Sequence, residues 1–175
     1  MLVDHTILIL FVIASATRLI SVFVSVANEK KLKKKNAIEY GKKNSRLLLL
    51  CHTLFYLSCL AETLLLKKQV NTISLIGFGL FIFSMTMLWI VIFSLKDIWT
   101  VKLIIAPGQN INKSFLFKYF RHPNYFLNII PELISIALIC QAWLTLLIGL
   151  PLYLIPLIIR IVQEERVMKM HFKNY

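Results

Sequence analysis

The sequence contains few charged residues and is especially short of acidic ones. Only 16% of its 175 residues are charged and just 8 are Asp or Glu, whereas 58% are hydrophobic. An ordinary soluble domain is about 45–50% apolar and about 25% charged. This composition excludes a fold that is surrounded by water on every side.

Cysteine and glycine are also scarce, and their positions exclude two kinds of site. Cys51, Cys59 and Cys140 lie inside hydrophobic stretches without the paired spacing of zinc ligands, so we expect neither a metal site nor a disulfide framework. We interpret them as small buried apolar residues. The five glycines form no Gly-rich turn between a strand and a helix, which excludes the soluble type of dinucleotide-binding motif.

The charge that is present is strongly basic, with a net value of +12 at pH 7. A nucleic-acid-binding surface would combine basic and aromatic residues on a soluble domain, but here the basic residues lie between apolar runs. We therefore expect no nucleic-acid partner. No linker-like segment divides the chain, so residues 1–175 are interpreted as a single domain. The first apolar run lacks a basic leader and a cleavage site, so we expect it to remain as a membrane helix.

Long hydrophobic runs dominate the sequence and predict an all-α helical bundle in a membrane. Residues 6–27, 47–66 and 70–95 each provide the roughly 20 apolar residues that cross a bilayer core. Residues 126–159 are apolar apart from Glu132, and one straight helix of that length would far exceed a ~30 Å core. We expect this last run to fold back on itself.

The fold-back predicts a helical hairpin and brings the total to about five membrane helices. Residues 141–143 are the expected turn, because a polar amide and an indole both suit the membrane interface. Pro131, Pro151 and Pro156 should bend the two helices of the hairpin.

The distribution of basic residues predicts the orientation of the chain. Of the 20 Lys and Arg residues, all but Arg18, Lys67 and Lys68 lie in residues 28–46, in residues 96–122 or in the tail from residue 160 onward. Cytoplasmic segments next to membrane helices carry an excess of basic residues. We therefore expect the amino terminus outside and the carboxyl terminus in the cytoplasm. Residues 1–100 would supply three helices and a basic loop, and residues 101–175 the hairpin and its flanking loop and tail.

Two polar groups of residues stand at the ends of the predicted hairpin. The sequence RHPNY at residues 121–125 stands where a basic loop re-enters the membrane, and Arg160, Glu164 and Glu165 follow at the end of the last span. If the hairpin forms, both groups converge on one pocket at membrane level. Adjacent carboxylates on a helix point about 100° apart, so we expect at most one glutamate to face it. The structural alternative is a belt of interfacial side chains and a solvated helical turn.

The combination of these motifs resembles the isoprenylcysteine carboxyl methyltransferase family and the related membrane phospholipid methyltransferases. RHPNY is followed by an apolar hairpin and by Arg160 four residues before the Glu-Glu pair, and Met168 and Phe172 complete the pattern. The resemblance begins near Pro107-Gly108. The earlier part, with NEKKLKKKNAIEYG, His52 and Glu62, is similar to bacterial members. We therefore expect a bacterial inner-membrane protein with a cytoplasmic active site.

The resemblance implies S-adenosylmethionine as the cofactor, held without a soluble nucleotide-binding fold. The two glutamates would accept hydrogen bonds from its amino group, while His122 or loop amides would donate to its carboxylate. Tyr125 would offer hydroxyl and ring contacts. The expected cofactor-binding residues are Pro107, Gly108, His122, Asn124, Tyr125, Glu164 and Glu165.

The resemblance also implies a lipid or lipidated methyl acceptor, with carboxyl O-methylation of an isoprenylcysteine-like group as the family default. Arg121 and Arg160 are the expected catalytic residues, because an acceptor carboxylate needs a cation to orient it. If the acceptor were a phenol or enol, His122 would be the candidate base. The alternatives are O-methylation of a polyketide lipid of the alkylpyrone type, N-methylation of a phospholipid headgroup, and a non-catalytic module that binds lipid.

Four other ionisable residues fall inside the predicted spans, where such groups are usually paired or functional. We expect Arg18, His52 and Glu62 to make hydrogen bonds between helices. Glu132 is expected to line a lipid tunnel or to pair with another span, in preference to a role in proton transfer.

Overall fold

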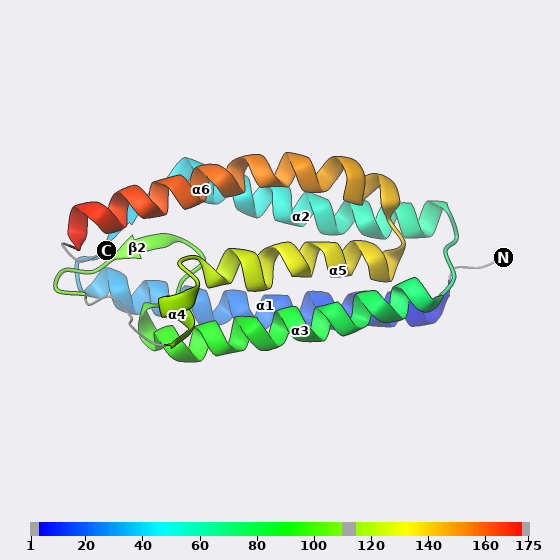
Figure 1. Ribbon diagram of the computed structural model, residues 1–175, viewed down its shortest axis with the longest axis horizontal. Helices are drawn as coiled ribbons and strands as arrows, with labels where there is room; N and C mark the ends of the chain where they lie inside the picture. Colours follow the sequence, from blue (N-terminus) through cyan, green and yellow to red (C-terminus); the bar gives the residue numbers. More distant parts are fainter. Residues whose placement is uncertain (1–3, 110–114, 173–175) are drawn as a thin grey trace.

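The computed structural model describes residues 4–109 and 115–172, except for the side chains of Phe115 and Lys118. Five longer helices run along one axis (Figure 1). They are α1 (His5–Lys34), α2 (Lys42–Leu65), α3 (Thr72–Leu95), α5 (Ile130–Cys140) and α6 (Leu150–His171). The shorter elements are β1 (Ile38–Tyr40), the 3₁₀ turn η1 (Lys96–Ile98), β2 (Leu103–Ile105), α4 (Phe115–Tyr119) and the π-helical turns η2 (Asn124–Ile129) and η3 (Thr145–Gly149).

The helices form an all-α membrane bundle, as the sequence predicts. Four of them are long and apolar enough to cross a membrane, namely His5–Lys34, Lys42–Leu65, Thr72–Ile98 and Thr145–His171. Large apolar side chains cover their outer faces, with Phe23 71% exposed and Leu65 80% exposed. Exposure on this scale is unfavourable in water and is expected against lipid. The protein is therefore an integral membrane protein.

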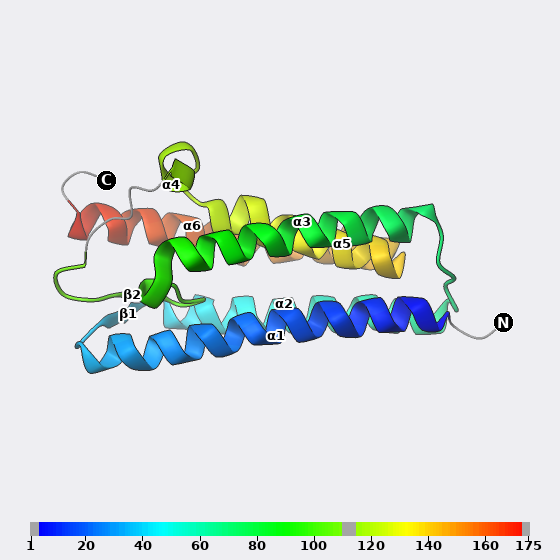
Figure 2. The same cartoon turned by 90° about the horizontal axis from the view of Figure 1, so that it is seen from below.

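The helices lie in two layers, with α1 and α2 in one and α3, α5 and α6 in the other (Figure 2). The apolar helix Asn124–Cys140 is shorter than the four spans, and it lies in the middle of the bundle (Figure 1). It packs closely on α3, because a Cβ atom at Gly77 would lie 2.7 Å from the backbone nitrogen of Ile139. Small residues permit such close approach between membrane helices. The side chains of Leu133, Ile136 and Ile139 are fully buried.

The predicted turn of the hairpin is confirmed at residues 141–143. Helix α5 ends at Cys140, and Gln141 adopts the left-handed conformation with φ 50°. The side chain of Gln141 donates to Ser74 Oγ at 3.1 Å and accepts from Asn71 Nδ2 at 3.2 Å, which fastens the turn to the start of α3. The start of the last helix is held by Glu62, whose carboxylate accepts from the backbone nitrogens of Leu144 and Thr145.

Two of the three prolines in the hairpin follow local changes in helix type. The π-helical turn η2 ends two residues before Pro131, and η3 ends two residues before Pro151. A proline removes one backbone donor and its ring crowds the carbonyl four residues earlier, and a widened turn relieves that crowding. Within η2 the backbone N–H of Ile130 accordingly donates to the carbonyl of Tyr125, five residues earlier. Pro156 stands inside α6, where its carbonyl accepts from Asn44 Nδ2 at 3.0 Å.

The two ends of the bundle differ in character. The described amino-terminal residues lie at one end, and the end of α6, both strands and α4 lie at the other (Figures 1 and 2). The strands pair antiparallel, with Ile38 opposite Ile105 and Tyr40 opposite Leu103. Leu103 and Ile105 pack on Val167 of α6, together with the partly buried Met168 and Phe172. The basic segments predicted to be cytoplasmic therefore gather at a single end.

Candidate functional site

The motif RHPNY and the Glu-Glu pair meet at the end of the bundle that carries the strands. Buried His122 has Nδ1 3.6 Å from Glu164 Oε1 and Nε2 3.5 Å from Glu165 Oε1. The hydroxyl of Tyr125, in the first turn of the next helix, donates to Glu164 Oε2. We call His122, Tyr125, Glu164 and Glu165 the site cluster. The predicted convergence of the two ends of the hairpin is confirmed for these four residues.

The expectation that only one glutamate faces the shared site is wrong. Both carboxylates reach His122, although they stand on adjacent residues of α6. The reason lies in the partner: an imidazole has two ring nitrogens on different sides of the ring. One planar side chain can therefore contact two carboxylates that diverge by about 100° around a helix.

The two carboxylates also set the charge of the imidazole. Burial lowers the pKa of His122, but the hydrogen bonds and negative charges of Glu164 and Glu165 outweigh burial and raise that pKa above its ordinary value. A larger fraction of His122 is therefore protonated near neutral pH, and an imidazolium donates from both nitrogens. In its protonated form the ring has an N–H group directed at each carboxylate.

Arg160 lies beside the site cluster and is only 2% exposed. It precedes Glu164 by one helical turn on α6 and interacts with Tyr125. Its guanidinium donates from one nitrogen to Ser45 Oγ at 2.9 Å and from another to the carbonyl of Val101 at 2.8 Å. A guanidinium has five N–H donors, so Arg160 keeps further donors for a ligand while its orientation is fixed by the protein.

Arg121 is placed differently from Arg160. It is exposed, and it makes no hydrogen bond or ion pair with any other described residue. Sequence spacing places Arg121 next to His122 in the chain, but the backbone turns the two side chains into different surroundings. The expected convergence of both arginines on one pocket is therefore found for Arg160 and not for Arg121.

Several buried polar atoms around the site cluster have no protein partner among the described residues. These are Asn124 Oδ1, Gln163 Oε1 and His122 Nδ1. His122 Nδ1 faces Glu164 Oε1, but the distance of 3.6 Å is too long for a hydrogen bond. The Gln163 side chain lies over Gly41, where a Cβ atom would clash with Gln163 Oε1. Gly41 also has φ +61°, a conformation that favours glycine. Sequence reasoning missed the contributions of Gly41 and Ser45, because a single small residue in a basic loop carries no recognisable pattern.

The turn at Pro107-Gly108 follows β2 at the end of the bundle that carries the strands. The backbone N–H of Gln109 donates to the carbonyl of Ala106 at 3.2 Å, and Gly108 has φ +71°. Pro followed by Gly with positive φ is the signature of a type II turn. Both residues are exposed. Among the described residues, no hydrogen bond or ion pair links this turn to His122 or the two glutamates.

Helix α1 holds the segment that supports Arg160. The backbone N–H of Val101 donates to Ser25 Oγ at 2.9 Å, and Asn28 Nδ2 donates to the carbonyls of Lys96 and Trp99, both at 2.9 Å. The carbonyl of Val101 then accepts from Arg160. A continuous chain of hydrogen bonds therefore runs from α1 to the buried arginine.

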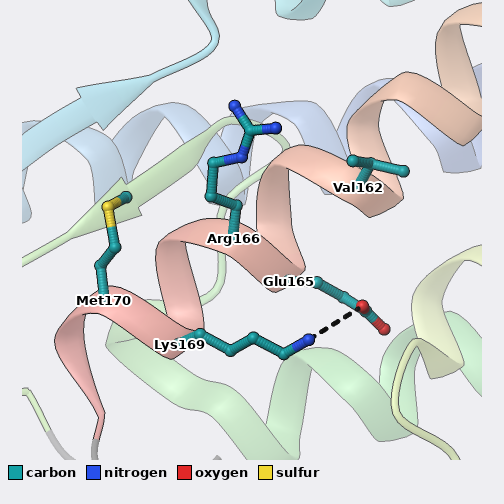
Figure 3. A pocket seen from close by; sticks show the side chains of 5 residues that line it. All are labelled: Val162, Glu165, Arg166, Lys169 and Met170. Carbon is teal, nitrogen blue, oxygen red and sulfur yellow. Dashed lines mark ion pairs between the residues drawn. The ribbon is translucent and has the colours of Figure 1, made fainter.

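An open hollow of about 430 Å³ lies on α6 next to the site cluster. Its lining residues are Val162, Glu165, Arg166, Lys169 and Met170. Figure 3 shows the side chains of Glu165 and Lys169 on one side of the helix and that of Arg166 on the other. Lys169 Nζ lies 3.8 Å from Glu165 Oε2. Because Glu165 also contacts His122, the hollow borders the site cluster and opens to the surface.

Comparison with known proteins identifies the family. The model of the isoprenylcysteine carboxyl methyltransferase (ICMT) family matches residues 75–170, which include every member of the site cluster and Arg160. The chain belongs to the ICMT family. It is therefore a membrane methyltransferase, and ICMT methyltransferases in general use S-adenosylmethionine. Helices α1 and α2 fall outside the matched range, and Ser25 and Ser45 with them.

Two bacterial relatives extend the similarity over most of the chain. An uncharacterized protein of Haemophilus influenzae is 51% identical over 160 residues, covering 91% of this chain and 93% of the relative. The uncharacterized protein YpbQ of Bacillus subtilis is 32% identical over 163 residues, covering 92% and 95%. No solved structure matches the chain. The similarity to these relatives therefore includes α1 and α2 as well as the ICMT region.

Proposed function

We propose that this protein transfers a methyl group from S-adenosylmethionine to a lipid-bearing acceptor at the site cluster. The observation that carries the proposal is the convergence of His122, Tyr125, Glu164 and Glu165 beside buried Arg160. These groups come from both ends of the hairpin and lie at one end of a membrane bundle. A lipid acceptor in the membrane and a cofactor from the cytoplasm can both reach such a position.

The residues present fit the cofactor. Its amino group requires hydrogen-bond acceptors, which the carboxylates of the two glutamates supply. Asn124 Oδ1 and Gln163 Oε1 are further acceptors, and neither has a hydrogen-bond partner among the described residues. We assign His122 to holding the glutamates, because both of its ring nitrogens face them. We retain the backbone amides near Pro107 and Gly108 as donors to the cofactor carboxylate. Tyr125 fixes Glu164 through its hydroxyl.

The chemistry requires alignment and exclusion of water more than covalent help. When bound, the cofactor supplies an activated methyl group on a sulfonium centre. An acceptor carboxylate is already ionised at neutral pH and needs no base. It does need a cation to orient it in a water-poor site, and the remaining N–H groups of Arg160 are suited to that role. The structure gives Arg121 no comparable surroundings, so the orienting role falls to Arg160.

We infer that the acceptor carries a carboxylate, as an isoprenylcysteine-like group does, and that the basic end of the bundle faces the cytoplasm of a bacterial inner membrane. The test is methyl incorporation from labelled S-adenosylmethionine into membrane lipids and into a prenylcysteine analogue. Wild-type protein should label an acceptor, and Glu164→Gln should label it far more slowly. Equal labelling by both proteins would contradict the proposed site.

A second candidate is O-methylation of a hydroxyl-bearing lipid, such as a polyketide, in which the hydroxyl proton would pass to His122 in its neutral form as the base. It is favoured by polar side chains that are buried inside the bundle. Asn128 and Glu132 follow Tyr125 along the same helix and carry an amide and a carboxylate inward from the site cluster. Extraction and mass analysis of the labelled lipid distinguishes the candidates, since a methyl ester is cleaved by mild base and a methyl ether is not.

A further inference from the structure

Five polar side chains from three helices meet in the interior of the bundle. Glu132 of α5 lies 3.3 Å from Arg18 of α1 and 3.4 Å from His52 of α2, and it accepts from the Tyr56 hydroxyl at 2.7 Å. Asn128 Oδ1 lies 3.4 Å from the same Arg18 nitrogen. We call Arg18, His52, Tyr56, Asn128 and Glu132 the interior cluster. The predicted pairing of Glu132 with another helix and the predicted interhelical hydrogen bond of Arg18 are thereby confirmed, whereas His52 approaches Glu132 without forming the predicted hydrogen bond.

The interior cluster has more hydrogen-bonding capacity than it uses among the described residues. Glu132 Oε2 is buried and lies near Arg18 without a hydrogen bond, and neither ring nitrogen of His52 has one. Only one nitrogen of the Arg18 guanidinium contacts a partner. Bulk water is absent at membrane depth, so unused polar groups there are costly. The Arg18 and His52 side chains remain 13% and 14% exposed, so a small group can reach them.

The interior cluster is continuous with the site cluster. Tyr125, Asn128 and Glu132 recur at helical spacing on one inward-facing side of η2 and α5 and are all buried. Glu132 follows Tyr125 by seven positions, which corresponds to a rise of about 10 Å. On α6, Tyr153 interacts electrostatically with Arg18 and Glu132 as well as with Arg160, and its ring lies 5.8 Å from that of His52. Polar side chains therefore extend inward from the point of methyl transfer.

The charges of the interior cluster define what it can hold. Arg18 and Glu132 carry opposite charges, so an anion would be repelled by one and a cation by the other. A hydrocarbon chain would leave the unused donors and acceptors without partners. A neutral group that both donates and accepts matches the free groups of Arg18, His52 and Glu132, and a hydroxyl is the smallest such group in lipids.

We propose that the interior cluster is a binding site for a hydroxyl group of the lipid acceptor, about 10 Å deeper in the membrane than the methylated atom. The identity of this lipid as the acceptor rests on the proposed function, whereas the binding of a hydroxyl does not. A plain isoprenyl chain has no group for this site. The acceptor is therefore a lipid with oxygen along its chain as well as at its head.

The first test uses wild-type protein and two lipids that differ in one group. Stearate and a hydroxystearate with a mid-chain hydroxyl are titrated against purified protein in nanodiscs, and the dissociation constants are compared. The hydroxylated lipid should bind about tenfold tighter, the ratio that ~1.4 kcal/mol of net hydrogen bonding gives. The O-methyl derivative of the hydroxystearate, which cannot donate, should lose most of this advantage. Equal binding of the three lipids would overturn the proposal.

A variant then locates the effect. Replacing both members of a buried ion pair by apolar residues of similar volume is often tolerated, whereas removing one member is not. The triple variant Arg18→Met, Tyr56→Phe, Glu132→Leu should therefore fold and bind all three lipids equally. Glu62→Gln is the control, because Glu62 also joins two helices but lies near the opposite end. It should keep the wild-type preference. A preference that survives in the triple variant would place the hydroxyl elsewhere and overturn the proposal.

Binding without cofactor separates this proposal from the proposed function. If the hydroxystearate binds preferentially but no lipid is ever methylated, the interior site stands and the methyl-transfer proposal fails. If lipids are methylated with no preference for a hydroxyl in binding or turnover, the methyl-transfer proposal stands and the interior site is overturned. Should the triple variant fail to fold, the wild-type comparison of the three lipids decides alone.

Discussion

His122 and Glu165 face each other across the hairpin, with His122 Nε2 lying 3.5 Å from Glu165 Oε1 although 43 positions separate the two residues. The contact exists because the chain reverses direction at Gln141 and returns to the same end of the bundle. It places a basic group and an acidic group at the position where a zwitterionic cofactor would bind.

The first prediction concerns the glutamates. Glu164→Gln and Glu165→Gln should each weaken S-adenosylmethionine binding, because each replaces a charge-assisted acceptor by a neutral one. The expected loss is about 1.5–3 kcal/mol, measured by calorimetry on purified protein in detergent. Glu39→Gln, on a strand at the same end of the bundle, is the control and should bind as wild type does. Unchanged affinity in both test variants would remove the carboxylates from the cofactor site.

The second prediction is a pH dependence of stability that arises from His122. The folded protein holds the pKa of His122 above its ordinary value, so the protonated ring stabilises the fold. This stabilisation is complete below the ordinary pKa and is lost as pH rises through the raised one. The unfolding temperature of wild type should therefore fall relative to that of His122→Asn as pH increases across this window. A constant difference at all pH values would show that His122 does not titrate as a partner of the glutamates.

The third prediction separates the two arginines. Arg160→Lys keeps the positive charge but loses the planar guanidinium that contacts Ser45 and Val101, so methyl transfer should slow markedly while cofactor affinity changes much less. Arg160→Ala should be slower still. Exposed Arg121 serves as the matched control, and Arg121→Lys should retain nearly wild-type turnover. Wild-type rates in Arg160→Lys would contradict the orienting role.

The fourth prediction tests the support that α1 gives to Arg160. Ser25→Ala removes the acceptor for the backbone N–H of Val101 and should cost about 1 kcal/mol of stability. Its effect on turnover should be less than additive with Arg160→Lys, because both act through one chain of hydrogen bonds. Ser25→Thr should restore function. Ser21→Ala is the control, since Ser21 is also buried on α1 but its hydroxyl donates to the carbonyl of Arg18 in its own helix. Each serine variant is combined with Arg160→Lys, and additive effects in both double variants would refute the link.

The fifth prediction concerns orientation in the membrane. Reporters placed after Tyr175 and near Lys42 should both read cytoplasmic, and one near Gln69 should read external, because the basic segments gather at one end of the bundle. The measurement uses fusions in intact cells to a phosphatase, which is active on the external side, and to a fluorescent protein, which is fluorescent in the cytoplasm. A carboxyl terminus on the external side would invert the orientation and place the cofactor site away from the cytoplasm.

Much of this fold follows from the sequence because membrane helices have a simple signature. Apolar length defines the spans, and the excess length of residues 126–159 requires the hairpin. The turn at Gln141 and the meeting of RHPNY with the Glu-Glu pair follow from that hairpin. The burial of Cys59 and Cys140 and the interhelical bonds of Glu62 likewise follow from their surroundings, whereas Cys51, which is also predicted to be buried, is only half-buried.

The finer arrangement of the site depends on contacts that sequence spacing does not record. The different surroundings of Arg121 and Arg160 depend on backbone direction in the loop and on α6. The bond from Ser25 to Val101 joins segments far apart in the chain. The contact of both glutamates with His122 depends on where a single ring lies. Each of these contacts is a matter of side-chain direction in three dimensions.

The π-helical turn η2 has a consequence for how the ICMT motif tolerates insertion and deletion. A π turn accommodates one more residue than an α-helical turn does in the same rise. Deleting one residue within this turn would therefore let it close to regular α-helical winding without rotating the helix on either side. Tyr125 would still face Glu164, and Glu132 would still face Arg18. The cost would fall on the backbone before Pro131, where the widened turn relieves crowding, so the segment tolerates the loss of one residue better than the loss of its polar side chains.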